Sequence, residues 1–337
     1  MIIRLETHIK TQDKTKILQK LESLQCKVTE VRTNEAHYLV GFSKKNEFDI
    51  ELVRKFTGVS EAHLVTDSYK LVSKQWKSTH SCLDLGDDIK IGNGHFAIIA
   101  GPCSIESEAQ ITQIIAHLIK NNIKIIRGGA FKPRSSPYAF RGLGIEGLKM
   151  FKALCQQHGI KIISEVMQIS QIAPMYDYID AYQVGARNSQ NFNLLDELGK
   201  VDKPVLIKRG ISGTIDELLQ SAEYVFSGGN ERLLLCERGI RTYETAYRNT
   251  FDINAIALLK SKSHLPVIAD PSHGVGMREY VSAIALAATV AGADGVMFEV
   301  HQTPEEALSD GQQTLNFTES ESLIKKINSL KDTMKTW

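Results

Sequence analysis

Ionisable side chains follow several short apolar runs of this chain, and the densest group lies in Arg127–Gly142, RGGAFKPRSSPYAFRG. Its cations and hydroxyl groups are Arg127, Lys132, Arg134, Ser135, Ser136 and Arg141. The glycines allow the backbone to approach a ligand closely, and Pro133 and Pro137 stiffen the loop. Fixed cations beside hydroxyl groups suit a phosphate or a carboxylate. The stretch is a candidate anion site, and the alternative interpretation is a basic surface loop.

Further cations follow later apolar runs, so that one larger cationic group is expected. Its members are Arg127, Lys132, Arg134, Arg187, Lys208 and Arg238. If these cations converge, they repel one another unless anions fill the site, and one phosphate with one carboxylate, or two phosphates, would suit it. The carboxylates that follow other runs are Glu165, Glu237 and Asp270, and they can pair with some of the cations. Three carboxylates do not neutralise six cations, which favours an anionic ligand.

A second group consists of one thiol, one imidazole and two carboxylates. These residues are Cys103, His273, Glu299 and Asp310. Together they could bind a divalent transition metal ion. Each also has a structural alternative, because Cys103 could be a small core residue, His273 a hydrogen-bonding loop residue and Asp310 a helix cap. Their wide separation in the sequence leaves both interpretations open at this point.

The elements that would position these groups are eight short apolar runs separated by amphipathic stretches such as 111–118 and 281–290. The runs are Phe96–Ala100, Ile123–Arg127, Ile160–Ser164, Ala181–Val184, Val205–Lys208, Leu233–Cys236, Pro266–Ala269 and Gly295–Phe298. Short apolar runs rich in branched residues are typical of buried parallel strands. Eight such units in about 240 residues predict an α/β fold of the (β/α)₈, or TIM, barrel class, whose strand ends meet on one face. An open doubly wound sheet is the alternative, but no glycine fingerprint follows the first run.

The residues before the barrel predict a small α+β unit with the order βαββαβ, which is ferredoxin-like. Its expected elements are a strand at 2–5, a helix carrying Ile17, Leu21 and Leu24, a hairpin of Val28–Val31 and Tyr38–Phe42, a helix carrying Phe48, Leu52 and Phe56, and a strand at 59–65. The unit holds no cluster of catalytic type, so we expect a role in regulation or assembly, with a structural cap as the alternative. The expected division is residues 1–70 for this unit, 71–95 for a polar linker and a hairpin, and 96–337 for the barrel.

Composition excludes several classes of function. The net charge of the 337 residues is +1, so no global basic field would attract nucleic acid or an acidic membrane. The five cysteines are odd in number and form no C-x-x-C pair, so no disulfide framework is expected. We find no signal peptide and no apolar run near the ~20 residues that span a bilayer, so the cytoplasm is the expected compartment and neither nucleic acid nor a membrane is an expected partner.

Many short motifs in order resemble one enzyme family. AGPCS, GGAFKPRSSPYAFRG, SEV, QVGARN, VLIKRG, CERGIRTYE, DPSHGVG and a late E…SDG resemble the type Iβ 3-deoxy-D-arabino-heptulosonate 7-phosphate (DAHP) synthases over residues 80–315. The front unit is similar to the ferredoxin-like extension of some members. The resemblance implies a barrel that condenses phosphoenolpyruvate with erythrose 4-phosphate and water to give DAHP and phosphate, the entry to the shikimate pathway of aromatic amino acid biosynthesis.

The same resemblance implies roles for individual residues. The implied metal ligands are Cys103, His273, Glu299 and Asp310, and the ion is Mn²⁺, with Fe²⁺, Co²⁺ and Zn²⁺ as alternatives. The implied phosphoenolpyruvate site is Arg127, Lys132, Arg187, Lys208 and Arg238. The implied erythrose 4-phosphate site is Arg134, Ser135 and Asp270. Lys132 is the candidate proton donor to the new alkoxide, and Glu165 is the candidate for handling the proton of the attacking water.

The resemblance leaves two alternatives and two further expectations. A 3-deoxy-D-manno-octulosonate 8-phosphate synthase acts on arabinose 5-phosphate, but it typically reads KANRSS where this chain reads KPRSS. A catalytically inactive barrel with a binding or regulatory role should have lost a ligand or a cation, and none is missing from the motifs. We also expect feedback inhibition by tyrosine or phenylalanine through the front unit, and a homo-oligomer, with a tetramer as the expected assembly.

Overall fold

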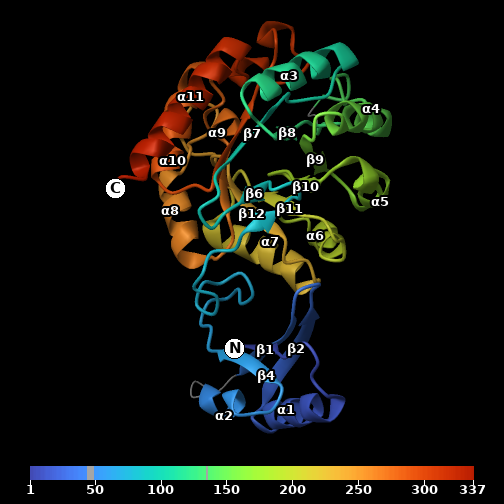
Figure 1. Cartoon of the computed structure of the whole chain (residues 1–337), viewed down its shortest axis with the longest axis vertical. Helices are drawn as coiled ribbons and strands as arrows, with labels where there is room; N and C mark the ends of the chain where they lie inside the picture. The colour runs from blue at the N-terminus through green and yellow to red at the C-terminus, as the bar shows by residue number, and fades with distance from the viewer. Residues whose placement is uncertain (44–48, 134–135) are drawn as a thin grey trace.

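The computed structural model describes residues 1–43, 49–133 and 136–337, and it places a small antiparallel sheet beside a larger closed barrel (Figure 1). In this described part of the chain, the sheets are a four-stranded one, an eight-stranded barrel and a two-stranded hairpin. The predicted fold class, a TIM barrel preceded by a small ferredoxin-like unit, is confirmed. No helix among the described residues combines the length and the apolar character needed to cross a membrane.

The front sheet is formed by the first 63 residues. Its elements are β1 (Ile2–Leu5), α1 (Thr11–Ser23), β2 (Cys26–Arg32), β3 (His37–Ser43), α2 (Ile50–Arg54) and β4 (Val59–His63). The strand order is β2-β3-β1-β4 with antiparallel pairs throughout, as a βαββαβ unit requires. Leu24 and Phe56 lie just beyond the helices predicted for them, and Phe48 lies outside the described residues.

The barrel strands run parallel around a closed ring. They are β7 (Ala97–Gly101), β8 (Ile125–Arg127), β9 (Lys161–Val166), β10 (Ala181–Val184), β11 (Val205–Lys208), β12 (Leu233–Glu237), β13 (Val267–Ala269) and β14 (Gly295–Glu299). Each strand pairs with its sequence neighbours, and β14 pairs with β7 to close the ring. All eight coincide with predicted runs to within two residues at either end. The functional groups that follow the strands are thereby collected at one face.

Helices cover the outside of the barrel (Figure 1). They are α3 (Glu108–Lys120), α4 (Gly144–Gln156), α5 (Ile172–Met175), α6 (Phe192–Leu198), α7 (Ile215–Ser227), α8 (Ile253–Lys262), α9 (Pro271–Val275), α10 (Arg278–Val290) and α11 (Phe317–Met334). Short 3₁₀ turns are η1 (Ile169–Gln171), η2 (Tyr176–Tyr178), η3 (Pro304–Glu306) and η4 (Gly311–Gln313). Capping boxes at Thr214 and Asn316 fix the starts of α7 and α11.

A hairpin of β5 (Leu83–Asp84) and β6 (Lys90–Ile91) packs against the inside of the barrel. Leu83, Leu85 and Ile91 belong to the same apolar cluster as the inward-facing side chains of the strands. Because Ala97 and Ala181, the first residues of β7 and β10, are part of this cluster, the hairpin closes the amino end of the barrel. The carboxyl end is left for the functional groups.

The segment that connects the front sheet to the barrel is packed into the protein, although its sequence is polar. Leu71, Val72 and Trp76 are buried. The Glu223 carboxylate on α7 accepts the backbone N–H groups of Leu71 and Val72 at 2.9 and 3.0 Å. The lone tryptophan of the predicted linker is therefore an anchor, and the linker is part of the packed surface of the barrel.

Candidate active site

A cleft of about 170 Å³ opens at the carboxyl ends of the barrel strands. Its charged lining residues are Arg127, Lys132, Glu165, Arg187, Lys208, Arg238, Arg241, Arg248, His273 and Asp310. Seven are Arg or Lys, and two are carboxylates. The sequence-based expectation that strand-end cations converge is met for each predicted cation within the described residues.

The four predicted metal ligands lie next to one another at the back of this cleft. The ligand atoms of Cys103, Glu299 and Asp310 all lie within 4.8 Å of one another, with the Cys103 Sγ 3.4 Å from Asp310 Oδ2. The His273 Nε2 lies 3.5 Å from Glu299 Oε1, which places the imidazole against this group. A thiol, an imidazole and two carboxylates at this spacing fit a divalent transition metal ion.

The motif DPSHG explains how His273 reaches the group. Asp270 follows β13 and caps the short helix α9, accepting the backbone N–H of His273 at 3.1 Å. Pro271 occupies the first turn, where a missing N–H costs nothing. The Asp270 Oδ2 also lies 2.8 Å from His273 Nδ1, so one carboxylate both starts the helix and orients the ring that it carries.

The backbone at Asp310 is equally specific. Its φ of 50° lies in the left-handed region, which aspartate tolerates better than most residues. The conformation directs the carboxylate toward Cys103, and Gly311 follows at once to begin η4. Strained backbone of this kind costs about 1–3 kcal/mol and is concentrated at functional sites.

Lys132 and Cys103 are held together by direct contacts. The Lys132 Nζ donates to the Cys103 carbonyl oxygen at 3.0 Å and lies 3.0 Å from its Sγ. Burial, with the nearby Glu299 carboxylate, raises the pKa of the Cys103 thiol to about 12, against the opposing effect of Lys132. Burial alone would lower the pKa of Lys132, but the negative charges of the ionised Cys103 and of the Glu165 and Glu299 carboxylates raise it above its ordinary value.

Two cations of the cleft are paired with buried carboxylates. Arg127 donates to Glu299 Oε1 at 3.0 Å, and Lys208 donates to Asp270 Oδ2. Burial opposes ionisation of Asp270, but His273 and Lys208 outweigh it and hold the pKa of this carboxyl well below its ordinary value. Asp270 therefore stays charged, where it neutralises Lys208 and contacts His273 Nδ1, and it is absent from the described residues that line the cleft.

Three guanidinium groups of the cleft have no carboxylate within ion-pair distance among the described residues: Arg187, Arg238 and Arg241. Arg238 is 4% exposed, and its guanidinium donates hydrogen bonds to the carbonyl oxygens of Gly239 and His273. Burial lowers its pKa. A buried guanidinium without a counter-ion is costly, so this wall of the cleft is complementary to an anion.

Glu165 lines the cleft, whereas Arg209 is absent from its described lining and connects two loops beside it. Arg209 is bound to Glu237 and Asp252, each at 2.9 Å, so it holds the loops after β11 and β12 together. Glu165 lines the cleft and lies over Gly185, where an added Cβ would come within 2.0 Å of its Oε1. The glycine of QVGARN thus leaves room for the Glu165 carboxylate.

Some site residues fall outside these observations, and others were not predicted. Arg134 and Ser135 lie outside the described residues, so their predicted place in the sugar phosphate site stays a prediction. Arg241, Arg248 and Gln313 were not predicted. Arg241 lies in the CERGIRTYE motif, and this second arginine close after Arg238 was the sequence feature that could have indicated it. Arg248 and Gln313 follow no apolar run, so the strand-end pattern could not reveal them.

Comparison with known proteins identifies the family. The profile described as the DAHP synthetase I family matches residues 69–336. The chain belongs to this family. It is therefore an enzyme, a transferase of the kind that carries out an aldol-type condensation. The matched region contains every barrel strand and every residue of the cleft described above.

Individual relatives agree with this assignment. The phospho-2-dehydro-3-deoxyheptonate aldolase of Thermotoga maritima is 40% identical over 99% of this chain and 98% of its own length. The crystal structure of a DAHP synthase from the same organism covers 99% of this chain and 97% of its own, with a TM-score of 0.79 and 39% identity. The 2-dehydro-3-deoxyphosphooctonate aldolase of Syntrophotalea carbinolica is 32% identical over 71% of this chain and 92% of its own length.

Proposed function

We propose that this protein is a DAHP synthase that condenses phosphoenolpyruvate with erythrose 4-phosphate and water, giving DAHP and phosphate as the first step of the shikimate pathway. The observation that carries the proposal is the group of unpaired guanidiniums, Arg187, Arg238 and Arg241, beside a cluster of metal-ligand type. Phosphoenolpyruvate carries a phosphate and a carboxylate on three carbons, so it needs several cations close together. The acceptor carries a second phosphate.

The competing function is condensation with arabinose 5-phosphate. The octulosonate relatives match about 71% of this chain, whereas the Thermotoga heptonate enzyme matches 99% of it, front sheet included. The motif KPRSS, with Pro133 directly before Arg134, also favours the four-carbon acceptor. A catalytically inactive barrel is disfavoured because the thiol, imidazole, carboxylates and cations are all present.

The composition of the cleft and the motif KPRSS support an assignment of binding residues. We assign the phosphate and carboxylate of phosphoenolpyruvate to Arg127, Lys132, Arg187, Lys208 and Arg238, and the phosphate of the acceptor to Arg134 and Ser135. Asp270 would act on the sugar site through Lys208 and His273, which it contacts, rather than by lining the cleft. Cys103, His273, Glu299 and Asp310 would hold Mn²⁺, or Fe²⁺, Co²⁺ or Zn²⁺ in its place. Such an ion supplies Lewis-acid polarisation of the acceptor carbonyl.

The residues of the chain handle the remaining steps. Carbon 3 of phosphoenolpyruvate attacks the aldehyde carbon of the acceptor, and the new alkoxide takes a proton from Lys132, whose Nζ is fixed beside Cys103. A water molecule adds at carbon 2, with Glu165 positioned on the cleft wall to accept its proton. The phosphate then leaves with cleavage of its carbon–oxygen bond, and the unpaired guanidiniums stabilise the departing charge.

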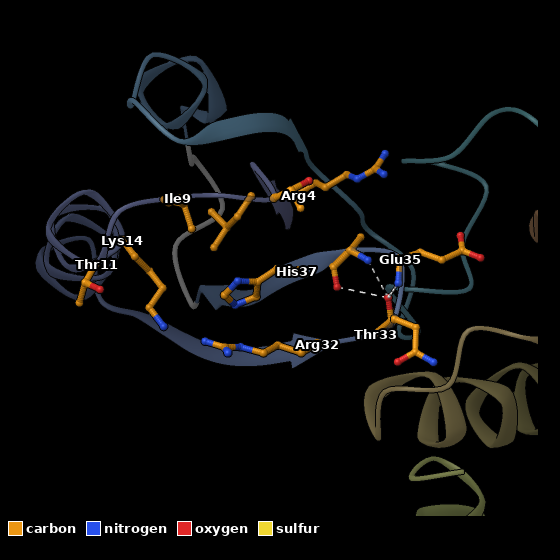
Figure 2. Close-up of a pocket in the computed structure, with 12 residues that line it drawn as sticks. Arg4, Ile9, Thr11, Lys14, Arg32, Thr33, Glu35 and His37 are labelled. Atoms are coloured by element: carbon orange, nitrogen blue, oxygen red, sulfur yellow. Dashed lines mark hydrogen bonds between the residues drawn. The ribbon is translucent and has the colours of Figure 1, made fainter. Parts of the chain in front are cut away.

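We further propose that residues 1–70 form a regulatory domain that residues 71–95 join to a catalytic barrel of residues 96–337. A pocket of about 360 Å³ lies on the front sheet, and Figure 2 shows the side-chain ends of Lys14 and Arg32 directed toward each other beside the His37 ring. The side chains of Lys14, Arg32 and His37 all contact one carboxylate, that of Glu30, at 2.8–3.1 Å. The apolar side chains of Leu5 and Ile9 line the same pocket.

This combination of cations and apolar surface suits an amino acid with a large side chain, and we propose tyrosine or phenylalanine as the inhibitor. Its carboxylate would replace Glu30 at Lys14 and Arg32. Replacing Lys14 or Arg32 by Met should raise the inhibition constant about tenfold or more, since a charge-assisted hydrogen bond contributes about 1.5–3 kcal/mol. Lys16→Met on the same helix is the control, because Lys16 is exposed and pairs with Asp13.

The position of the front domain constrains how inhibition could work. Thr33 on its β2–β3 turn donates a hydrogen bond to Glu231, which precedes β12, whereas the cleft residue Arg238 follows β12. The domain therefore docks near the amino end of this strand, on the side away from the cleft. We propose that it covers the cleft of another copy of the chain, within a cytoplasmic homotetramer.

A substrate panel tests the proposed reaction. The full chain is incubated with phosphoenolpyruvate, Mn²⁺ and either erythrose 4-phosphate or arabinose 5-phosphate, and phosphate release and the sugar product are measured. We expect turnover with erythrose 4-phosphate. Preferential turnover of arabinose 5-phosphate would establish the competing function. If neither sugar phosphate were consumed, the result would support an inactive barrel.

A further inference from the structure

Gln313 is a fully buried amide that lies between the metal-ligand cluster and the cleft. Its Nε2 donates to Glu299 Oε2 at 2.8 Å, and its Oε1 accepts from Arg248 NH1 at 2.7 Å. A carboxylate only accepts hydrogen bonds and a guanidinium only donates them, so both contacts fix the amide in one orientation. Gln313 is thus the link in a chain of contacts from Arg248 through the amide to Glu299.

The two ends of this chain have different surroundings. Glu299 is buried, and its other oxygen accepts from Arg127 at 3.0 Å. Arg248 lines the cleft, with its side chain 32% exposed, and its NH1 lies 3.6 Å from Asp310 Oδ1. A guanidinium in contact with the cleft therefore touches one proposed metal ligand directly and reaches a second through Gln313.

We propose that Gln313 is a positioning residue that couples binding of an anion in the cleft to binding of a divalent cation by Cys103, His273, Glu299 and Asp310. The proposal rests on the metal site proposed above and adds to it a residue and a linkage. A cation bound by Asp310 and Glu299 takes up the negative charge that faces Arg248, so the guanidinium repels the cation. An anion beside Arg248 removes this repulsion. By thermodynamic reciprocity, each ligand then strengthens the binding of the other.

Gln313 contributes to this coupling in two ways. It donates to one oxygen of Glu299 and thereby sets the rotation of the carboxylate, as outer contacts of metal ligands commonly do. It also holds the Arg248 guanidinium near the cluster. An anion bound to Arg248 therefore lies close enough to affect the binding of a cation there. A side chain of similar length without polar atoms would keep the packing and lose both effects.

The test is a Co²⁺ titration of the metal-stripped full chain, with and without inorganic phosphate, following the absorption of the Cys103 thiolate–cobalt bond. The variant is Gln313→Met. The matched control is Gln312→Met, because Gln312 is the exposed neighbour of the same residue type. Circular dichroism verifies folding. Gln313→Asn, which keeps the amide but is too short to reach both partners, replaces Gln313→Met if the latter does not fold.

We expect phosphate to tighten Co²⁺ binding to the wild type and to Gln312→Met. In Gln313→Met, Co²⁺ binding should weaken about 10- to 100-fold, as for other lost outer contacts, and the phosphate effect should disappear. The inference would be overturned if Gln313→Met bound Co²⁺ with the affinity of the wild type and if phosphate tightened that binding as it does in the wild type. Measurements on the wild type distinguish failure of this inference from failure of the proposed function. If the proposed function were wrong, the wild type would bind no Co²⁺ through Cys103 or would turn over neither sugar phosphate.

Discussion

Lys132 Nζ lies 3.0 Å from the Sγ of Cys103, which brings an ammonium group from the loop after β8 against a thiol from the loop after β7. Both side chains are buried. The second contact of Lys132, to the Cys103 carbonyl oxygen, leaves the ammonium group little freedom. In the proposed role of Lys132 as proton donor, this fixed position would require no rearrangement when the alkoxide forms.

Replacing Lys132 by Met should lower kcat about 10²- to 10⁴-fold, the usual contribution of a positioned proton donor. Binding of Co²⁺ should remain, because Lys132 is not one of the proposed ligands. Lys149→Met is the control, since Lys149 is exposed on α4 and pairs with Glu146. Single-turnover kinetics measure the chemical step directly. An unchanged rate for this step would remove Lys132 from the role of proton donor.

Metal removal should abolish activity, because the thiol, the imidazole and two carboxylates lie together at the back of the cleft. A chelator should inactivate the wild type, and Mn²⁺ should restore it. Cys103→Ala should still bind phosphoenolpyruvate but should not turn it over. The control is Cys82→Ala, which removes an exposed thiol directly before β5, at the amino end of the barrel and away from the cluster. Full activity of metal-free Cys103→Ala would disprove the metal requirement.

The barrel was predictable because a strand covered on both faces is an apolar run in the sequence. The runs Ala181–Val184 and Val205–Lys208 coincide at both ends with β10 and β11. A charged residue at the end of such a run, or within a few residues after it, lies at the carboxyl end of a barrel strand. Arg127, Arg187 and Lys208 could therefore be assigned to one cleft without knowledge of the packing.

Arg248 shows where this reasoning stops. It belongs to the long loop after β12, where Ile240 and Thr250 pair through both backbone hydrogen bonds and fold the loop back on itself. The backbone N–H of Arg248 is bound by the Val275 carbonyl oxygen. Its place over the cleft therefore depends on contacts between distant segments, which no local pattern records. Trp76 is similar, because its neighbours in the sequence are polar although its ring packs against the rings of Tyr38 and His264.

Arg134 is expected to bind the phosphate of the acceptor, on the evidence of the motif KPRSS. Arg134→Ala should raise the KM for erythrose 4-phosphate about ten- to a hundredfold, since one charge-assisted contact contributes about 1.5–3 kcal/mol. The KM for phosphoenolpyruvate should change far less. Arg141→Ala, an exposed arginine of the same loop, is the control. Equal effects on the two substrates would contradict the assignment.

His264 should make stability depend on pH. It is buried, with Nδ1 2.8 Å from Ser81 Oγ and Nε2 2.8 Å from the Leu71 carbonyl oxygen. Burial, with the charge of Lys77, lowers its pKa from 6.5 to about 3. The unfolded chain therefore binds a proton near pH 6.5 that the folded chain does not, and the free energy of unfolding falls as the pH drops through this range.

For this group the expected loss of stability between pH 7 and pH 5 is about 2 kcal/mol. Urea unfolding at both pH values measures it. His264→Gln should reduce the difference by about that amount, and His158→Gln, which replaces an exposed histidine, should leave it unchanged. If His264→Gln kept the full pH dependence, another group would be responsible.

The junction between the front sheet and the barrel decides where the front domain can be removed. The rings of Tyr38, Trp76 and Phe226 meet edge to face, with centroids 5.5 Å apart for Tyr38–Trp76 and 5.9 Å for Tyr38–Phe226. Trp76 also packs on His264. Because Trp76 covers the barrel as well as the front sheet, a chain that begins at Ser81 loses part of the barrel's own apolar cover.

We therefore expect two truncations to differ. A chain that begins at Asp67 retains Trp76 and should be folded, active and insensitive to tyrosine and phenylalanine. A chain that begins at Ser81 should be less stable by about 3–5 kcal/mol, the cost of removing a buried tryptophan from its site. Thermal unfolding and inhibition assays on both chains and the intact protein measure the two effects.

Inhibition that persists in the chain beginning at Asp67 would place the effector site in the barrel. If tyrosine, phenylalanine and later products of the pathway did not inhibit the intact protein, the front domain would have a structural role.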